Sequence, residues 1–218
     1  MAKHRKPSGK SSGFGNPRPL GALRRRPGRR QPLKRLVIVC EGEKTEPLYF
    51  ESLRKEQRLS SIDIKIVKSR SAPTYIVQEG IRQKKELDDE RDEVWCVFDA
   101  ECRAAEAPFQ QAVAASRSHG LELAVSNPAF EYWYILHFVC TDRPFGTADE
   151  CFRELQAHLP GYEKARPVFD ELKERLAVAL ANADRLRQNA SDSWQTFPNP
   201  STGVDVLVHS IRDLLNDR

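Results

Sequence analysis

The sequence predicts an α/β fold in which a mostly parallel, four-stranded sheet is flanked by helices and followed by a helical C-terminal portion. Two continuous apolar runs, at residues 35–40 and 94–98, are typical of strands that are covered on both faces. Strand and helix signals alternate up to residue 125, and this order favours parallel strands joined by right-handed crossovers. From Asn127 onward only helical patterns are found.

The individual elements follow from local patterns. After the first strand, a helix is expected over Thr45–Arg58, because Pro47 is tolerated in a first helical turn. Residues 62–66 alternate between apolar and polar, which predicts a second strand. The remaining expected elements are, in chain order, a helix over 73–87, a strand over 94–98, a helix over 104–119 that Gly120 ends, a strand over 121–125, and helices over 128–138, 147–158, 165–189 and 202–217.

Charge divides the chain into an arm and a body. Residues 1–35 hold twelve of the 35 Lys and Arg and no acid, so their net charge is +12 and that of the remainder is −8. Because residues 1–34 are also rich in Gly, Pro and Ser, we expect a disordered basic arm. Such an arm contacts nucleic acid, or it is a solubilising or partner-binding tail or the result of a misplaced start codon. The body is divided into an α/β domain at 35–140 and a helical extension at 141–218 that packs on it.

Several classes of protein are disfavoured. No apolar run approaches the ~20 residues that span a bilayer, and no signal-peptide pattern follows the first positive charges, so a cytoplasmic protein without a membrane partner is expected. The five cysteines form no Cys-x-x-Cys pair, which argues against a zinc or redox site and favours reduced core cysteines. Their positions are 40, 96, 102, 140 and 151.

Acidic residues follow the two apolar strands at the point where each strand ends. Glu41 follows the first strand, and Asp99 and Glu101 follow the third. Because ligands gather beyond the carboxyl ends of parallel strands, these three acids converge if the two strands are neighbours. Clustered carboxylates repel each other unless a cation holds them, and such hard oxygen ligands suit Mg²⁺ or Mn²⁺. The sequence therefore predicts a metal site formed by Glu41, Asp99 and Glu101.

A bound divalent ion would fit phosphodiester hydrolysis. It can deliver a hydroxide nucleophile and stabilise the leaving oxygen, and Lys44 could steady a substrate phosphate. Gly42 would let the backbone approach the site closely. The alternative is that these acids lie at strand ends only because loops are solvated, while Glu43 and Glu46 favour the dipole of the following helix.

Four motifs in chain order resemble the RloB family over residues 35 to the C-terminus. They are Val-Cys-Glu41-Gly-Glu-Lys44-Thr-Glu46-Pro-x-Tyr-Phe50, Val-Trp-Cys-Val-Phe-Asp99-x-Glu101, Ser-Asn127-Pro-x-Phe-Glu131-x-Trp133, and Asn199-Pro-Ser-Thr202.

This resemblance implies a variant of the Toprim fold, which is shared by topoisomerases, primases and small RNA-maturation nucleases. In Toprim proteins a glutamate after the first strand and an Asp-x-Asp after the third bind Mg²⁺, which implies Glu41 and Asp99 as ligands. The second acid of that pair is Glu101 here, and its extra methylene shifts the carboxylate outward by about one bond length. The family is also typical of phage-defence and restriction loci, which implies a defence effector with a possible ATPase partner.

The remaining candidates each have two interpretations. Glu131 is either a further metal ligand or general base, or an internal ion-pair partner beside core aromatic residues. His137 is expected to be structural, and Asn199 and Thr202 are expected to cap the last helix, with Thr202 the better cap. Basic residues around the helix at 165–189 either line a phosphate track or form its solvated face, the second being favoured. They are Lys164, Arg166, Lys173, Arg175, Arg185 and Arg187.

Two functions of different classes follow. The first is a metal-dependent nuclease that acts on DNA or RNA, possibly tRNA, as a defence effector, with catalytic Glu41, Lys44, Asp99, Glu101 and Glu131. The second is a catalytically weak subunit that anchors nucleic acid or an ATPase. A strand-passing or primase enzyme is disfavoured because its extra domains have no room in 218 residues.

Overall fold

The computed structural model describes Met1 and residues 34–42, 44–66, 72–164, 166–190 and 197–216. Residues Leu33–Arg218 form one compact unit. The basic arm expected at 1–34 lies outside the described residues apart from its two ends.

In the described part of the chain, five strands form one mixed sheet in the order β2-β1-β3-β4-β5. The first four strands are parallel: β1 (Leu36–Cys40), β2 (Ile62–Ile66), β3 (Glu93–Asp99) and β4 (Glu122–Asn127). This parallel part confirms the sequence-based prediction. The expectation that strands end at Asn127 was wrong, because β5 (Ser201–Thr202) pairs antiparallel with the end of β4. Two residues are too few to give a periodic signal.

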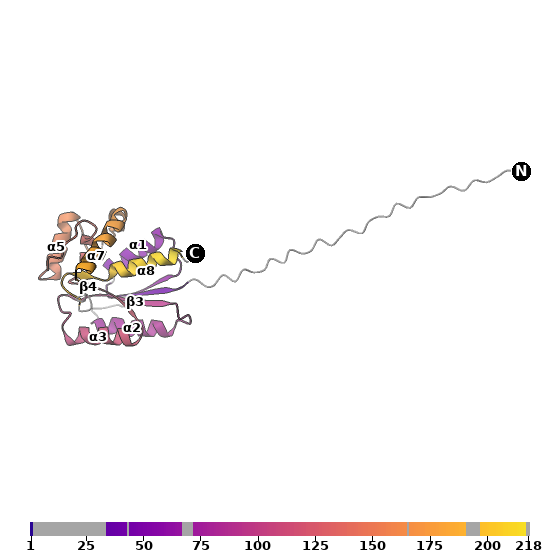
Figure 1. The fold of residues 1–218 in the computed structure, drawn as a ribbon, viewed down its shortest axis with the longest axis horizontal. Coiled ribbons are helices and arrows are strands. Elements are labelled where there is room, and N and C mark those ends of the chain that lie inside the picture. The colour runs from indigo at the N-terminus through magenta and orange to yellow at the C-terminus, as the bar shows by residue number, and fades with distance from the viewer. Residues whose placement is uncertain (2–33, 43, 67–71, 165, 191–196, 217–218) are drawn as a thin grey trace. The chain divides into compact units, whose positions relative to one another are not determined.

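Helices cover both faces of the sheet. Figure 1 shows α2 (Pro73–Lys85) and α3 (Ala107–Ser118) side by side on one face, with α1 (Thr45–Glu56) on the other. The C-terminal helices share the face of α1. They are α4 (Glu131–Ile135), α5 (Ala148–His158), α6 (Phe169–Leu172), α7 (Leu176–Ala190) and α8 (Val204–Asn216), with the 3₁₀ helix η1 (Lys173–Arg175) between α6 and α7.

The sheet separates two hydrophobic cores, because successive side chains of a strand point to opposite faces. In β1, Leu36 and Ile38 join the core of the α1 side, whereas Val37 and Val39 join the core under α2 and α3. Every residue of β1 is buried. This burial on both faces is the physical reason for the continuous apolar run in the sequence.

Three predicted helices have different boundaries in the structure. The helix expected at 104–119 begins at Ala107, where Pro108 fits the first turn. The helix expected at 128–138 is reduced to α4, because i→i+3 bonds of the 3₁₀ type flank it, such as that from Tyr132 N–H to Ala129 O. The helix expected at 165–189 is divided into α6, η1 and α7 and begins only after Pro167, which disfavours helix at the preceding residue. Residue 165 lies outside the described part.

Gly203 sets how closely β5 and α8 approach the sheet. A Cβ at this position would lie 3.2 Å from the Cα of Ala124 and from the carbonyl oxygen of Leu123, so a side chain there would crowd β4. Next to it, the Thr202 hydroxyl accepts the N–H of Val204 at the start of α8 and is 2.9 Å from the Ser126 hydroxyl. Thr202 therefore accepts a backbone N–H at the start of α8, as predicted of a capping residue, although Thr202 itself lies in β5.

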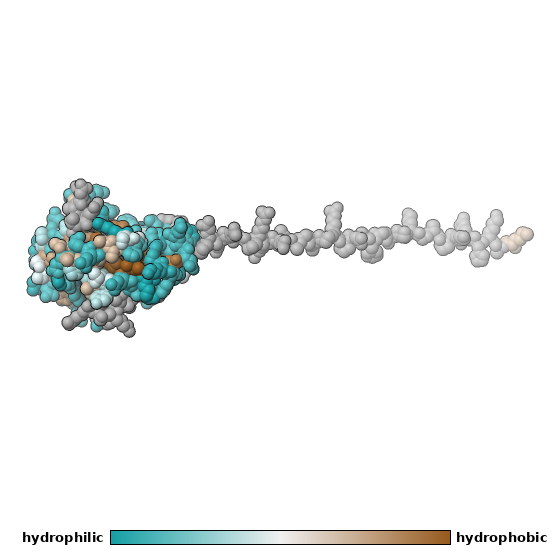
Figure 2. Space-filling view, turned by 90° about the horizontal axis from the view of Figure 1, so that it is seen from below, coloured by the Kyte–Doolittle hydropathy of each residue, from teal (hydrophilic) through white to brown (hydrophobic). Residues whose placement is uncertain are grey.

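The surface of this unit is mostly hydrophilic where Figure 2 views it from the side of α2 and α3, with a small apolar area near its middle. Among the described residues, no helix is long and apolar enough to cross a membrane.

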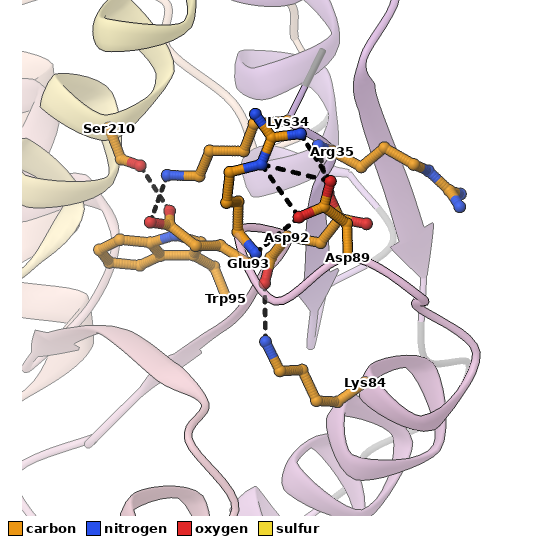
Figure 3. A network of polar contacts seen from close by, with 9 residues as sticks. Lys34, Arg35, Lys84, Asp89, Asp92, Glu93, Trp95 and Ser210 are labelled. Atoms are coloured by element: carbon orange, nitrogen blue, oxygen red, sulfur yellow. Dashed lines mark hydrogen bonds and ion pairs between the residues drawn. The ribbon is translucent and has the colours of Figure 1, made fainter. Parts of the chain in front are cut away.

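Glu93, at the amino end of β3, joins this strand to α8 and to the segment before β1 (Figure 3). Its carboxylate pairs with Lys34 and accepts hydrogen bonds from the Trp95 indole at 3.0 Å and from the Ser210 hydroxyl of α8 at 2.6 Å. Burial alone would raise the pKa of Glu93, but these three donors lower it. Beside it, Asp92 accepts the backbone N–H of Arg35 at 2.7 Å, which fixes the start of β1.

We expect Glu93→Ala to lower the free energy of unfolding by about 1–3 kcal/mol, because it leaves Trp95 and Ser210 without their acceptor. Glu86→Ala removes the same side chain from the exposed ion pair with Arg82 and should change stability by less than about 0.5 kcal/mol. Urea unfolding followed by tryptophan fluorescence measures both variants. Equal losses in the two would contradict a special role for Glu93.

Candidate functional site

The neighbouring ends of β1 and β3 bring the first two predicted acids together. Cys40 lies opposite Val97 in this parallel pair, and the Glu41 N–H donates to Val97 O at 3.1 Å, one residue beyond the strand. The Asp99 N–H donates to a carboxylate oxygen of Glu41 at 3.4 Å. The chain runs from β1 outward to β2 and then back across to β3, so this is the switch point of the strand order, where α/β proteins bind ligands.

A cleft of about 300 Å³ opens at this edge of the sheet. The structure places all five predicted site residues in its lining, together with residues from the start of α1 and from the C-terminal half of the chain. The lining residues are Glu41, Gly42, Lys44, Thr45, Glu46, Asp99, Glu101, Phe130, Glu131 and Lys164.

The loop after β1 forms one wall. A Cβ on Gly42 would overlap the carboxylate of Glu46, so this position needs a residue without a side chain unless Glu46 moves away. Glu46 lies in the first turn of α1 but is only 6% exposed, so it faces the cleft and is not a solvated helix acid. Lys44 immediately precedes α1 and is exposed at the mouth.

The turn after β3 carries Glu101 in an unusual backbone conformation. Glu101 and Cys102 have φ angles of 48° and 62°, which cost of order 1–2 kcal/mol per non-glycine residue. Two hydrogen bonds hold the turn: the Glu101 N–H donates to Pro128 O at 3.0 Å, and the Cys102 N–H donates to Asn127 Oδ1 at 3.1 Å. Glu101 is exposed at the rim, whereas Asp99 is half-buried.

The deep wall comes from distant parts of the chain. Glu131, in the first turn of α4, is 2% exposed and accepts a hydrogen bond from the Tyr162 hydroxyl at 3.1 Å. Lys164, two residues after Tyr162, lines the same cleft. Its backbone carbonyl accepts a hydrogen bond from the Thr45 hydroxyl at 3.0 Å. This bond joins the loop before α6 to the start of α1.

The cleft is electrostatically strained. Burial raises the pKa of Glu41 to about 7, and the charges of Glu46 and Glu101 add to this effect. Burial and the charges of Glu46, Glu131 and Glu41 raise the pKa of Asp99 well above its usual range. Burial and the charge of Glu131 raise the pKa of Glu46 as well. The positive charge of Lys164 opposes the shifts of Asp99 and Glu46. Negative charge therefore exceeds positive charge here, which is the condition for binding a cation.

The donor chemistry fits a divalent ion held through water. Across the described ranges, no three His, Cys, Asp or Glu side chains lie close enough to form a complete cage. Mg²⁺ does not require one, because it commonly binds one or two carboxylates and keeps several waters. Glu41 and Asp99, hydrogen-bonded to each other through the Asp99 N–H, are suited to that role, and Glu101 can reach in from the rim.

Other predicted candidates lie elsewhere. Asn199 does not cap α8, because its amide binds both the N–H and the carbonyl of Phe145 at 3.2 and 2.6 Å. Arg187 is neither on a phosphate track nor on a solvated face, because its guanidinium binds buried Asp205 at 2.6 Å. His137 is fully buried, its Nδ1 lies 3.0 Å from Trp133 O, and burial lowers its pKa to about 4, consistent with a structural role.

The cysteines and the basic residues of the last third also differ in part from expectation. Cys40, Cys96 and Cys151 are buried and free, but Cys102 is exposed, so the expectation of core cysteines was wrong there. Lys173 pairs with Asp170 at 2.9 Å and Arg166 with Glu171 at 2.5 Å, as expected of a solvated face. Sequence reasoning did not assign Lys164 to the acidic cleft, because no local pattern marks it.

The fold and the site together define a class of protein: an α/β protein with an acidic cleft at the switch point of a mostly parallel sheet. The chain belongs to the RloB-like protein family, whose model matches residues 36–211. Neither a curated protein nor a solved structure matches this chain.

The raised pKa of Glu41 has a measurable consequence for stability. Glu41 ionises near pH 4.5 in the unfolded chain and near pH 7 in the folded protein. The loss of folding stability caused by its buried charge is therefore absent below about pH 4.5 and complete above pH 7. We therefore expect Glu41→Gln, measured in chelator, to stabilise the protein by about 1–3 kcal/mol at pH 8 and by little at pH 4.5. Denaturant unfolding at the two pH values measures this difference.

Glu106→Gln is the matched control, because Glu106 is exposed and Arg103, hydrogen-bonded to its carboxylate, lowers its pKa. This control should give no stabilisation at pH 8. A Glu41→Gln protein that is no more stable than the control would contradict the electrostatic account of the cleft.

Proposed function

We propose that this protein is a metal-dependent nuclease of the Toprim type that hydrolyses phosphodiester bonds in DNA or RNA, tRNA included, as a cytoplasmic defence effector. One observation carries the proposal: Glu41, Asp99 and Glu101, from two adjacent strand ends, share a cleft with Lys44 and Lys164. Metal-dependent hydrolysis of a phosphodiester uses carboxylates to bind the metal ion and positively charged groups to bind the phosphate. Membership of the RloB-like family is consistent with it.

Each side chain has an expected task. Glu41 and Asp99 would hold Mg²⁺ or Mn²⁺, with Glu101 as the outer ligand. When bound, such an ion supplies a nucleophilic water at neutral pH and neutralises charge on the phosphate. Lys44 and Lys164, which line the cleft, would bind the non-bridging oxygens, and Glu131 would accept a proton through water.

A second candidate function is a catalytically weak subunit that binds nucleic acid or an ATPase partner in a defence complex. The observation that favours it is Glu101, which is exposed on a left-handed turn where the Toprim pattern has an aspartate. Its longer side chain and rim position weaken the third ligand. The two functions differ in whether bond cleavage depends on metal.

Cleavage of plasmid, single-stranded DNA and total tRNA in Mg²⁺ or Mn²⁺ tests the proposal. We expect cutting that is lost in EDTA and falls by at least about 100-fold in Asp99→Ala and Glu41→Ala, because each removes a metal ligand. Glu174→Ala, an exposed acid of η1, should cut normally. Persistent binding without cutting, with the suspected ATPase partner present or absent, would support the subunit instead.

The phosphate role of Lys164 gives a separate prediction. We expect Lys164→Ala to weaken nucleic-acid binding and to reduce the slope of log K against log salt by about 0.7–0.9, the value for one phosphate contact. Lys173→Ala removes a lysine that pairs with Asp170 and should leave the slope unchanged. Fluorescence anisotropy from 50 to 300 mM salt measures both, and identical slopes in the two variants would exclude a phosphate contact by Lys164.

A further inference from the structure

A second, larger cleft adjoins the acidic one. Its volume is about 540 Å³, and Glu41, Asp99 and Glu101 line both clefts. The three carboxylates therefore form a wall common to the two spaces. A molecule held at these carboxylates has room to extend on either side of them.

The second cleft differs from the first in chemistry. Its other lining residues are mostly small or apolar: Ala72, Pro73, Ala100, Pro108 and Phe109, with Arg103 and Glu106. The two charged residues bind each other, with 2.8 Å between the Arg103 guanidinium and the Glu106 carboxylate. Among the described lining residues, this side of the carboxylates has small and apolar residues and no lysine, whereas the first cleft has Lys44 and Lys164.

The walls of the second cleft come in part from the first turns of α2 and α3. Pro73 begins α2, and Pro108 is the second residue of α3. Phe109 is packed edge-on against Phe98 and Phe197, with ring centroids 5.8 and 5.3 Å apart. Phe109 is only 3% exposed, so this packing supports the cleft from behind, as expected of a ligand pocket that is largely formed in advance.

We propose that this second cleft takes the base of an unpaired nucleotide next to the phosphate held at Glu41, Asp99 and Glu101, so that the substrate is single-stranded or looped nucleic acid. The inference rests on the proposed nuclease function and names its substrate class. A base has an apolar face that such walls can cover, and this contact is tolerant of sequence. In a duplex the base is paired and stacked, so it cannot enter the cleft without being flipped out.

The side chains that the two clefts do not share indicate which cleft takes the nucleic-acid backbone and which takes the base. Lys44 and Lys164 favour the sugar-phosphate backbone in the first cleft, whose lining also holds the carboxylates of Glu46 and Glu131. Apart from the three shared carboxylates, the charges that line the second cleft compensate each other, because Arg103 pairs with Glu106. The base therefore belongs on the side of α2 and α3.

Ala72→Trp tests the cleft by filling it. Ala72 is exposed, precedes α2 with φ −54° and ψ 150°, and makes none of the carboxylate contacts, so a larger side chain is tolerated by the backbone. Ala114→Trp places the same side chain on the exposed face of α3 as a control. Melting temperatures of both full-length variants show whether the fold is retained.

The substrates are one labelled oligonucleotide as a single strand and the same strand annealed to its complement, each made as DNA and as RNA. We expect the single strand to be cut at least about tenfold faster than the duplex, and Ala72→Trp to lower that rate by about tenfold or more while Ala114→Trp does not. A duplex cut as fast as the single strand, or an unaffected Ala72→Trp, overturns the inference and leaves the nuclease standing.

If the wild-type protein cuts neither substrate, the nuclease proposal fails separately. Fluorescence anisotropy of the labelled single strand in Ca²⁺ then tests whether the second cleft binds a base. Weaker binding of the single strand by Ala72→Trp than by Ala114→Trp supports a base in the second cleft. Equal binding by the two variants overturns it.

Discussion

The parallel pairing of β1 with β3 is the constraint from which the site follows. Cys40 lies beside Val97, so Glu41, one residue further on, and Asp99, the last residue of β3, lie at the same edge of the sheet. Both strands are buried on both faces, and a shift of one residue would turn every apolar side chain toward the wrong core. The position of the acids is therefore fixed by the packing of the cores and requires no interaction among the acids themselves, which repel each other.

The C-terminal half of the chain completes this edge of the sheet. Glu131 and Lys164 form the deep wall, and Tyr162 binds the buried carboxylate of Glu131. The bond from Thr45 to the carbonyl of Lys164 links that wall to the start of α1. The segment that follows β4 is thus part of the cleft as well as of the core. Folding tolerates the unfavourable charges because the two cores supply stability elsewhere, a distribution typical of functional sites.

The sequence alone could predict what local pattern determines. The apolar runs that end at Glu41 and Asp99 gave the buried parallel strands and the meeting of these acids, because strand periodicity and crossover handedness leave few arrangements. It could not place Glu46 or Lys164 in the cleft, since their positions depend on how distant segments pack. The antiparallel β5 has no signal in the sequence, because two residues carry no period. The helix expected from residue 165 begins later in the structure, because Pro167 disfavours helix at the residue before it.

Gly203 has a consequence for solubility that is separate from the chemistry of the cleft. Because the backbone at Gly203 lies against Ala124 and Leu123, a side chain at residue 203 would push β5 and the start of α8 away from the end of β4 by a few tenths of an ångström. A strand whose edge is left uncovered presents backbone donors and acceptors to other chains. By allowing β5 to cover the β4 edge at Ser126 and Asn127, the lack of a side chain at residue 203 helps to keep that part of the edge from pairing with another copy of the protein.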